Sequence, residues 1–106
     1  AEPRIVSVAS TATLSISSSA TDQSIITAQA EALTIAAPTG TPVEGQKVIV
    51  RIKDDGSARG ITFNAIFRAI GVTLPTTTVA SKITYLGLVY NSTDTKWDIV
   101  ATKTEA

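Results

Sequence analysis

The residues of this chain that could do chemistry are its acidic, basic and aromatic side chains, because the sequence has no histidine, cysteine or methionine. Disulfide bonds, thiol nucleophiles, sulfur or imidazole metal sites and imidazole-dependent catalytic triads are therefore excluded. A metal ion could be held only by oxygen ligands. The search for a site comes down to carboxylates, arginines and a few aromatic rings.

Two adjacent carboxylates, Asp54 and Asp55, precede Gly56 in a short polar segment. Such a pair could supply part of a calcium shell, but no further acidic residue follows at ligand spacing. A tight hairpin turn, for which Gly56 supplies the positive φ, accounts for the same residues. We therefore predict a turn and no metal site.

A second pair of carboxylates, Asp94 and Asp98, lies around Trp97, the single tryptophan. No serine with a base and no phosphate-binding glycine loop accompanies it, so we predict a protein that is not an enzyme and binds no cofactor. Trp97 itself has two interpretations, a platform that stacks on a sugar or an anchor of the core. Tyr85 and Tyr90 share one predicted strand at odd spacing, so they point to opposite faces and cannot form one platform.

Arg59 and Arg68 frame an apolar stretch that contains Phe63 and Phe67. If the two phenylalanines are in the core, both arginines could reach carboxylates on a partner protein in bidentate geometry. They could equally pair within the chain, with carboxylates such as Asp54, Asp55 or Asp98. The sequence leaves both interpretations open.

The charge balance argues against nucleic acid as a partner. Nine basic residues offset nine acidic ones, whereas nucleic-acid binding needs clustered Lys and Arg. Residues 5–46 contain no Lys or Arg, and eight of the nine basic residues follow from Lys47 onward. No apolar run is long enough to span a membrane, and the N-terminus lacks the pattern of a secretory signal. We expect a protein made in the cytoplasm, with no membrane partner.

The apolar pattern predicts strands throughout the chain. Alternation over residues 4–19 indicates two short strands broken near Ser10, and residues 21–38 favour strands with a polar crossing at Gln29 and Glu31. The segment 38–46 is rich in Pro and Gly and predicts a turn. The strongest predicted strand, at residues 47–54, follows this turn directly. Two further strands, at residues 82–91 and 96–104, end the chain.

These segments together predict an all-β fold: a small antiparallel β-sandwich, or a jelly-roll or barrel-like domain. Residues 1–20 are expected to form an extended N-terminal arm or edge strands, and residues 21–106 a single sandwich domain. After the turn at Gly56 we expect a strand that returns as a hairpin, and we expect Pro75 at a strand end or in a loop.

Residues 40–101 resemble a β domain of tailed-bacteriophage virion proteins. The resemblance rests on a succession of short pieces rather than on one motif: G-x-P, G-Q-K, a strand, D-G, A-R, an aromatic residue, L-P-T, K, an apolar strand and K-W-D. In this sequence they read GTPVEGQKVIVRIKDDGSARGITFNAIFRAIGVTLPTTTVASKITYLGLVYNSTDTKWDIVA. In that family the domain often lies near the C-terminus of long tail or fibre proteins, but no coiled coil or shaft accompanies it here, so we expect a free-standing copy.

A free-standing copy resembles the small decoration or cement proteins of phage capsids. The resemblance implies a structural protein on the exterior of the virion that binds the major capsid protein, often as a homotrimer, and stabilises the shell. The alternative within the same resemblance is a tail or fibre domain that binds carbohydrate on the host surface.

The first 20 residues are the part of the chain that we most expect to be covered by a partner. They are β-prone and nearly uncharged, so a free edge there would be prone to aggregate. We therefore expect residues 4–19 to be covered by a neighbouring subunit or by the capsid. The candidate interface consists of Arg4, Ile5, Val6, Val8, Leu14, Ile16, Arg59 and Arg68.

Overall fold

The computed structural model describes residues 2–106, which form an all-β fold. Within this range there is no helix, and hence none that could cross a membrane. Nine strands are formed by the described residues: β1 (Ile5–Val8), β2 (Thr13–Leu14), β3 (Gln23–Gln29), β4 (Leu33–Ile35), β5 (Lys47–Asp54), β6 (Ile61–Phe63), β7 (Phe67–Ala69), β8 (Ile83–Asn91) and β9 (Lys96–Thr104).

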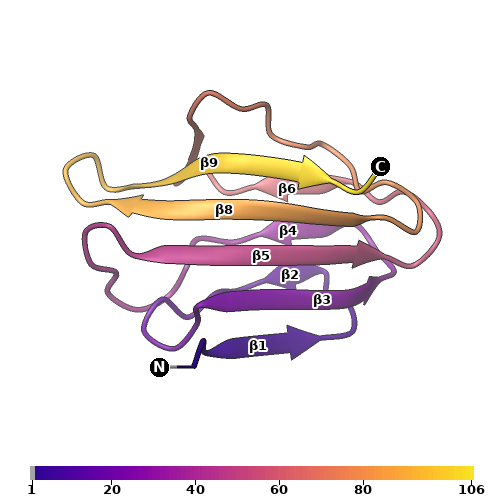
Figure 1. Cartoon of the computed structure of the whole chain (residues 1–106), viewed down its shortest axis with the longest axis horizontal. Coiled ribbons are helices and arrows are strands. Elements are labelled where there is room, and N and C mark those ends of the chain that lie inside the picture. The colour runs from indigo at the N-terminus through magenta and orange to yellow at the C-terminus, as the bar shows by residue number, and fades with distance from the viewer. Residues whose placement is uncertain (1) are drawn as a thin grey trace.

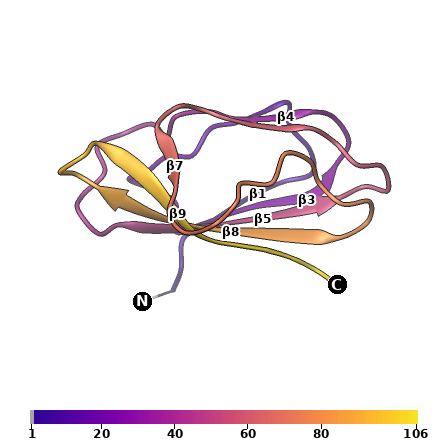
Figure 2. The ribbon, with the colours of Figure 1, turned by 90° about the horizontal axis from the view of Figure 1, so that it is seen from above.

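The strands lie in two layers. A six-stranded sheet has the order β1-β3-β5-β8-β9-β7, and a three-stranded sheet has the order β2-β4-β6. Figure 1 looks onto the larger sheet, with the smaller one behind it, and Figure 2 shows the gap between the layers from above. Isoleucines, leucines and valines from both sheets fill this gap as one core.

The chain winds through the two layers as a coil. It alternates between the sheets from β1 to β6, so that β1, β3 and β5 pair in parallel in one sheet and β2, β4 and β6 in the other. Of the seven strand pairs in residues 2–106, only β5–β8 and β8–β9 are antiparallel. The predicted antiparallel pairing is therefore correct for these two pairs and wrong for the others.

The turn after β5 is not a hairpin, which corrects a prediction from the sequence. Gly56 has the expected positive φ, +136°, but the chain crosses to the smaller sheet and enters β6 instead of returning beside β5. A parallel sheet requires such a crossing, because parallel neighbours cannot be joined by a short turn. The prediction of a turn at Gly56 is confirmed. The direction of the chain after it is determined by the pairing of β6 with β4 in the smaller sheet.

The core follows the alternation of the strands. On β5 the buried apolar side chains are Val48, Val50 and Ile52, each fully shielded from solvent. Phe67 is also buried, and Phe63 packs edge-on against it with ring centroids 6.1 Å apart. Burial of a Val, Leu or Ile side chain contributes about 1.5–3 kcal/mol, so this layer of apolar residues is the main source of stability.

Residues 5–16 form the first turn of the coil. The two strands predicted on either side of Ser10 are β1 and β2, and both are edge strands of their sheets. Leu14 and Ile16 belong to the common core. The segment is thus attached to the rest of the fold through both layers.

Buried polar side chains hold the corners where the chain changes layer. Gln29 ends β3 and is fully buried. Its amide oxygen accepts a hydrogen bond from the Thr11 N–H (3.1 Å), and its amide nitrogen donates to the carbonyls of Thr11 and Glu31 (2.7 Å each). At the polar crossing predicted at Gln29 and Glu31, the hydrogen bonds of the Gln29 side chain therefore connect two successive turns of the coil.

We expect Gln29→Leu to lower the free energy of unfolding by about 2 kcal/mol or more, because each orphaned buried polar group costs about 1–3 kcal/mol. Urea denaturation followed by circular dichroism measures this loss. Gln23→Leu is the matched control, since Gln23 is only partly buried on the same strand. Equal stability of the two variants would contradict the role given to Gln29.

Candidate binding surface

Arg4, the first residue of the predicted interface, is paired within the chain. Its guanidinium lies 2.9 Å from a carboxylate oxygen of Asp22 and also donates to the carbonyl of Ser19. The hydrogen bond and charge of Asp22 raise the pKa of Arg4, and the bonds from the Arg4 side chain and N–H lower the pKa of Asp22. This pair joins the start of β1 to the start of β3.

Arg59 and Arg68 also have internal partners. Arg59 lies 3.3 Å from Asp55, and Arg68 bridges Asp94 at 3.0 Å and Asp98 at 2.8 Å. The hydrogen bond from Arg68 lowers the pKa of Asp98 against the opposing effect of its burial. Of the two interpretations left open by the sequence, the structure shows pairing within the chain. Asp94 and Asp98, the carboxylates around Trp97, both bind the Arg68 side chain.

The apolar members of the predicted interface divide into two groups. Ile5, Val6 and Val8 on β1 are exposed, with 53%, 47% and 39% of their surface accessible. Leu14 and Ile16 are buried and contribute to the core. In the single chain Leu14 and Ile16 therefore offer a partner almost no accessible surface, because the second layer uses them for its own packing, and their place in the interface stays a prediction.

Trp97 is a core anchor and offers no platform for a sugar. Only 1% of its surface is accessible, and its ring packs on Tyr90 with centroids 5.2 Å apart. Tyr85 and Tyr90 point to opposite faces, as predicted: Tyr90 is buried, and Tyr85 is 42% exposed on the outer side of the larger sheet.

The outer side of the larger sheet carries cations that have no partner in the described chain. One row of neighbours runs Ile25–Arg51–Tyr85–Lys103 across β3, β5, β8 and β9. Exposed Ile49 lies two residues before Arg51 on the same face. The four cations on this side are Lys47, Arg51, Lys53 and Lys103, and none of them forms an ion pair within residues 2–106. We call this surface the outer basic face, and define it by Lys47, Ile49, Arg51, Lys53, Tyr85 and Lys103.

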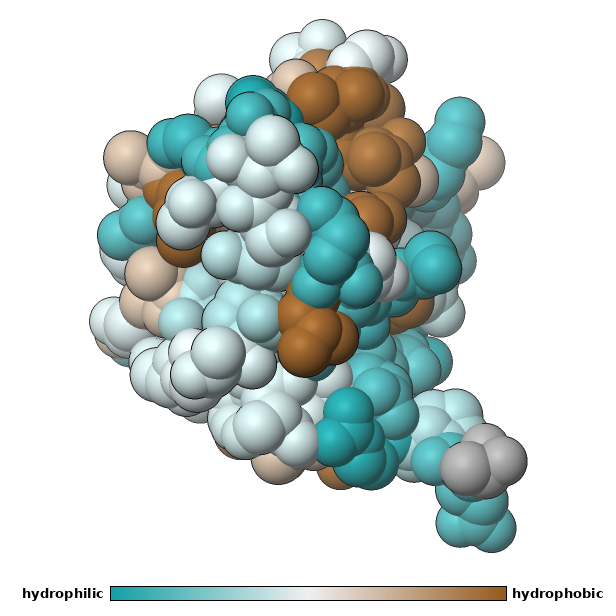
Figure 3. Space-filling model, turned by 90° about the vertical axis from the view of Figure 1, so that its left-hand side faces the viewer, coloured by the Kyte–Doolittle hydropathy of each residue, from teal (hydrophilic) through white to brown (hydrophobic). Residues whose placement is uncertain are grey.

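A shallow hollow beside Tyr85 makes part of this face concave. It has a volume of about 390 Å³ and is lined by Ile83, Tyr85, Lys103, Thr104 and Glu105. At the end of the molecule seen in Figure 3, hydrophobic surface occurs in separate patches between hydrophilic and neutral ones. The outer basic face thus combines an exposed aromatic ring, an aliphatic side chain and unpaired positive charge, a composition suited to binding an acidic protein surface.

Part of this face could be read from the sequence. The alternation of Arg51 and Lys53 with buried residues on the strongest strand places both on one side. Tyr85 and Lys103 come beside them only through the register of three strands, and no local pattern shows that register.

The candidate calcium loop is part of the scaffold. Asp54 is buried and accepts hydrogen bonds from the Thr78 hydroxyl (2.5 Å) and from the N–H groups of Gly56 (2.8 Å) and Ser81 (3.1 Å). Burial raises the pKa of Asp54, but these bonds and the charge of Arg59 outweigh it, so the pKa lies below its usual value. No cluster of acidic side chains suited to a metal ion occurs among the described residues.

No family model matches this chain, and no match to it was found among curated proteins or solved structures.

We expect Asp54 to make the stability of the protein dependent on acid pH. Because its folded-state pKa is lowered, its ionised form stabilises the fold above about pH 4, and this contribution is lost as the pH falls through the folded-state pKa. Asp54→Asn should cost about 1–3 kcal/mol at pH 7 and reduce the difference in unfolding free energy between pH 7 and pH 3.

Urea denaturation at the two pH values measures both effects. Asp55→Asn is the control, because Asp55 is exposed and has only long contacts, with Arg59 (3.3 Å) and the Ser57 N–H (3.4 Å), and it should retain the pH dependence of the wild type. An unchanged pH dependence in Asp54→Asn would contradict the assignment.

Proposed function

We propose that this protein is a structural component of a tailed-phage virion, a non-enzymatic decoration protein that binds the major capsid protein on the exterior of the shell and stabilises it. The proposal takes its biological setting from the resemblance of residues 40–101 to phage virion domains. In this proposal the two layers are a β-sandwich whose edge is formed by residues 1–20. The homotrimer implied by the same resemblance stays a prediction.

The observation that carries the proposal is the outer basic face. The three arginines Arg4, Arg59 and Arg68 are neutralised within the chain, whereas the cations around Tyr85 have no ion-pair partner in residues 2–106. A sheet face with exposed Tyr85 and Ile49 between cations fits an acidic and partly apolar protein surface. The whole chain has nine basic and nine acidic residues, so the residues outside the outer basic face are five basic and nine acidic and carry net negative charge. An acidic partner is therefore attracted to this one side.

Such binding would stabilise a shell by mass action. A protein that binds only the assembled form contributes about 2.7 kcal/mol per site when its free concentration is about 100 times the Kd. Linked copies that bind together gain further, by a factor of about 10² to 10⁴ when the geometry allows simultaneous contact. Modest affinity of each face is therefore sufficient.

A tail or fibre domain that binds host-surface carbohydrate is the second candidate. Trp97, the residue that would have supported it, is buried. The specific observation that still favours it is the hollow beside exposed Tyr85, because a tyrosine at the wall of a depression can stack on a sugar.

The proposal is tested by binding the purified protein to capsids of the encoding phage that lack it. Particles are pelleted and the bound copies counted by quantitative gel, and saturation at a fixed number set by the capsid lattice is expected. Arg51→Gln with Lys103→Gln should raise the Kd about tenfold, since each exposed pair lost contributes about 0.2–1 kcal/mol. The loss should be largest at low salt.

The matched control is Arg59→Gln with Lys96→Gln, which removes the same charge outside the outer basic face and should leave the Kd unchanged. Equal losses in both double variants would show a general charge effect and contradict the role of the face. Absence of binding to shells, with binding to host cells or glycans that Tyr85→Ala abolishes, would favour the carbohydrate alternative.

A further inference from the structure

The inner side of β1 is exposed although its neighbours in the same rows are buried. Val6 is aligned with Ser24 and Val50, and Val8 with Ile26 and Ile52. The four residues on β3 and β5 are at most 4% exposed, whereas Val6 and Val8 are 47% and 39% exposed. Both valines point toward the second layer and find nothing there to cover them.

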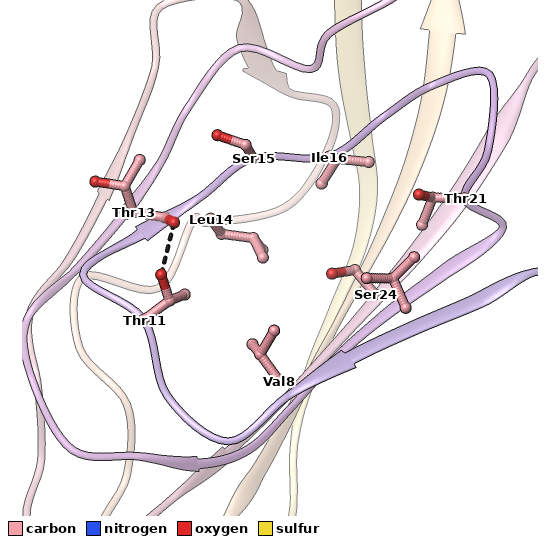
Figure 4. Close-up of a pocket in the computed structure, with 9 residues that line it drawn as sticks. Val8, Thr11, Thr13, Leu14, Ser15, Ile16, Thr21 and Ser24 are labelled. Atoms are coloured by element: carbon pink, nitrogen blue, oxygen red, sulfur yellow. Dashed lines mark hydrogen bonds between the residues drawn. The ribbon is translucent and has the colours of Figure 1, made fainter.

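The cause is that the smaller sheet, measured across its strands, does not reach as far as β1, the edge strand of the larger sheet. In Figure 1, β2 lies behind the region between β3 and β5, and β1 extends beyond it at the lower end. The step leaves a partly open pocket of about 210 Å³ between β1 and the segment that contains β2. Figure 4 shows Val8, Leu14 and Ile16 directed into this space from its two sides. We call this feature the N-terminal notch and define it by Val6, Val8, Leu14, Ile16 and Ser24.

The N-terminal notch has the form of a missing strand. An added strand would cover Val6 and Val8, and it would lie beside β2, which among the strands of residues 2–106 pairs only with β4. The N–H and C=O groups on the other side of an edge strand are available for such pairing. On this edge the Thr13 carbonyl accepts a bond from the Thr11 hydroxyl (2.8 Å), a local contact that a main-chain donor can replace.

We propose that the N-terminal notch is filled by β1 of a second copy of this chain, in a symmetric dimer. The protruding element and the step beside it are complementary: one strand extends beyond the smaller sheet, and one strand is needed to cover it. A two-fold axis midway between the layers and parallel to the strands exchanges the two sheets. It brings β1 of each copy into the layer of the other copy's β2. Each copy thus adds one strand beside the smaller sheet of the other, and the interface is isologous.

Charge and size agree with this occupant. Residues 5–20 contain no charged side chain, so two identical copies meet there without like-charge repulsion. Arg4, at the start of β1, is neutralised by Asp22. The whole molecule extends 38 Å along its longest axis and 23 Å along its shortest. These extents set the upper limit of the area at the β1 end, which is comparable to the ~800 Å² that each partner buries in a standard interface. At the opposite end, the segment that follows the short strand β7 extends beyond β9 (Figure 1).

The test is the mass of the purified full-length protein in solution, by light scattering or analytical ultracentrifugation over a range of concentrations. A dimer of twice the 11.0 kDa chain mass is expected. Val6→Lys should raise the dimer Kd at least about 100-fold, because the interface would then bury two unpaired ammonium groups. Circular dichroism and thermal unfolding confirm that the variant is folded, which we expect because Val6 is half exposed in the single chain.

Ile5→Lys is the matched control, because Ile5 is the adjacent residue on the outer side of the same strand and equally exposed. It should leave the dimer intact. A monomer at all concentrations, a trimer, or a dimer equally sensitive to both variants would overturn the proposal. The measurement uses no capsids, so its outcome is independent of the proposed function, and a trimer would instead support the three-fold arrangement that the phage resemblance implies.

Discussion

The parallel pairing of β1, β3 and β5 is the constraint on which the rest of the structure depends. Parallel neighbours cannot be joined by a two-residue turn, so the chain must leave the sheet between them. Here each excursion is used to build a second sheet, and β2, β4 and β6 are thereby also parallel. The apolar side chains that face the gap between the layers follow from this winding.

The winding creates corners, and the corners explain the buried polar residues. Gln29 on β3 is aligned with Asp54 on β5, so two successive turns of the coil place a polar side chain at the same corner. Each binds main-chain groups of the turns around it, which satisfies the polar atoms of the buried side chain. A carboxylate that looked available for a metal is instead occupied by the scaffold.

Internal neutralisation decides which charges face a partner. The arginines near turns have acidic neighbours and are held by them. The cations on β5 and β9 alternate with core residues and point outward from the sheet, where the adjacent strands provide Tyr85 and Ile25 rather than carboxylates. The outer basic face and the N-terminal notch thus lie on different sides of the fold and could serve different partners at the same time.

The residue pattern alone predicts the all-β class, most strand positions, the opposite orientations of Tyr85 and Tyr90, and the crossing at Gln29. These are consequences of alternation and turn chemistry, which act over a few residues. Long-range packing sets the other features: Gly56 leads to the other layer, Leu14 and Ile16 are core, Arg68 is held by Asp94 and Asp98, and the inner side of β1 is exposed. Each of these depends on which distant strands become neighbours, and strand pairing is set by packing across the whole core rather than by any local pattern.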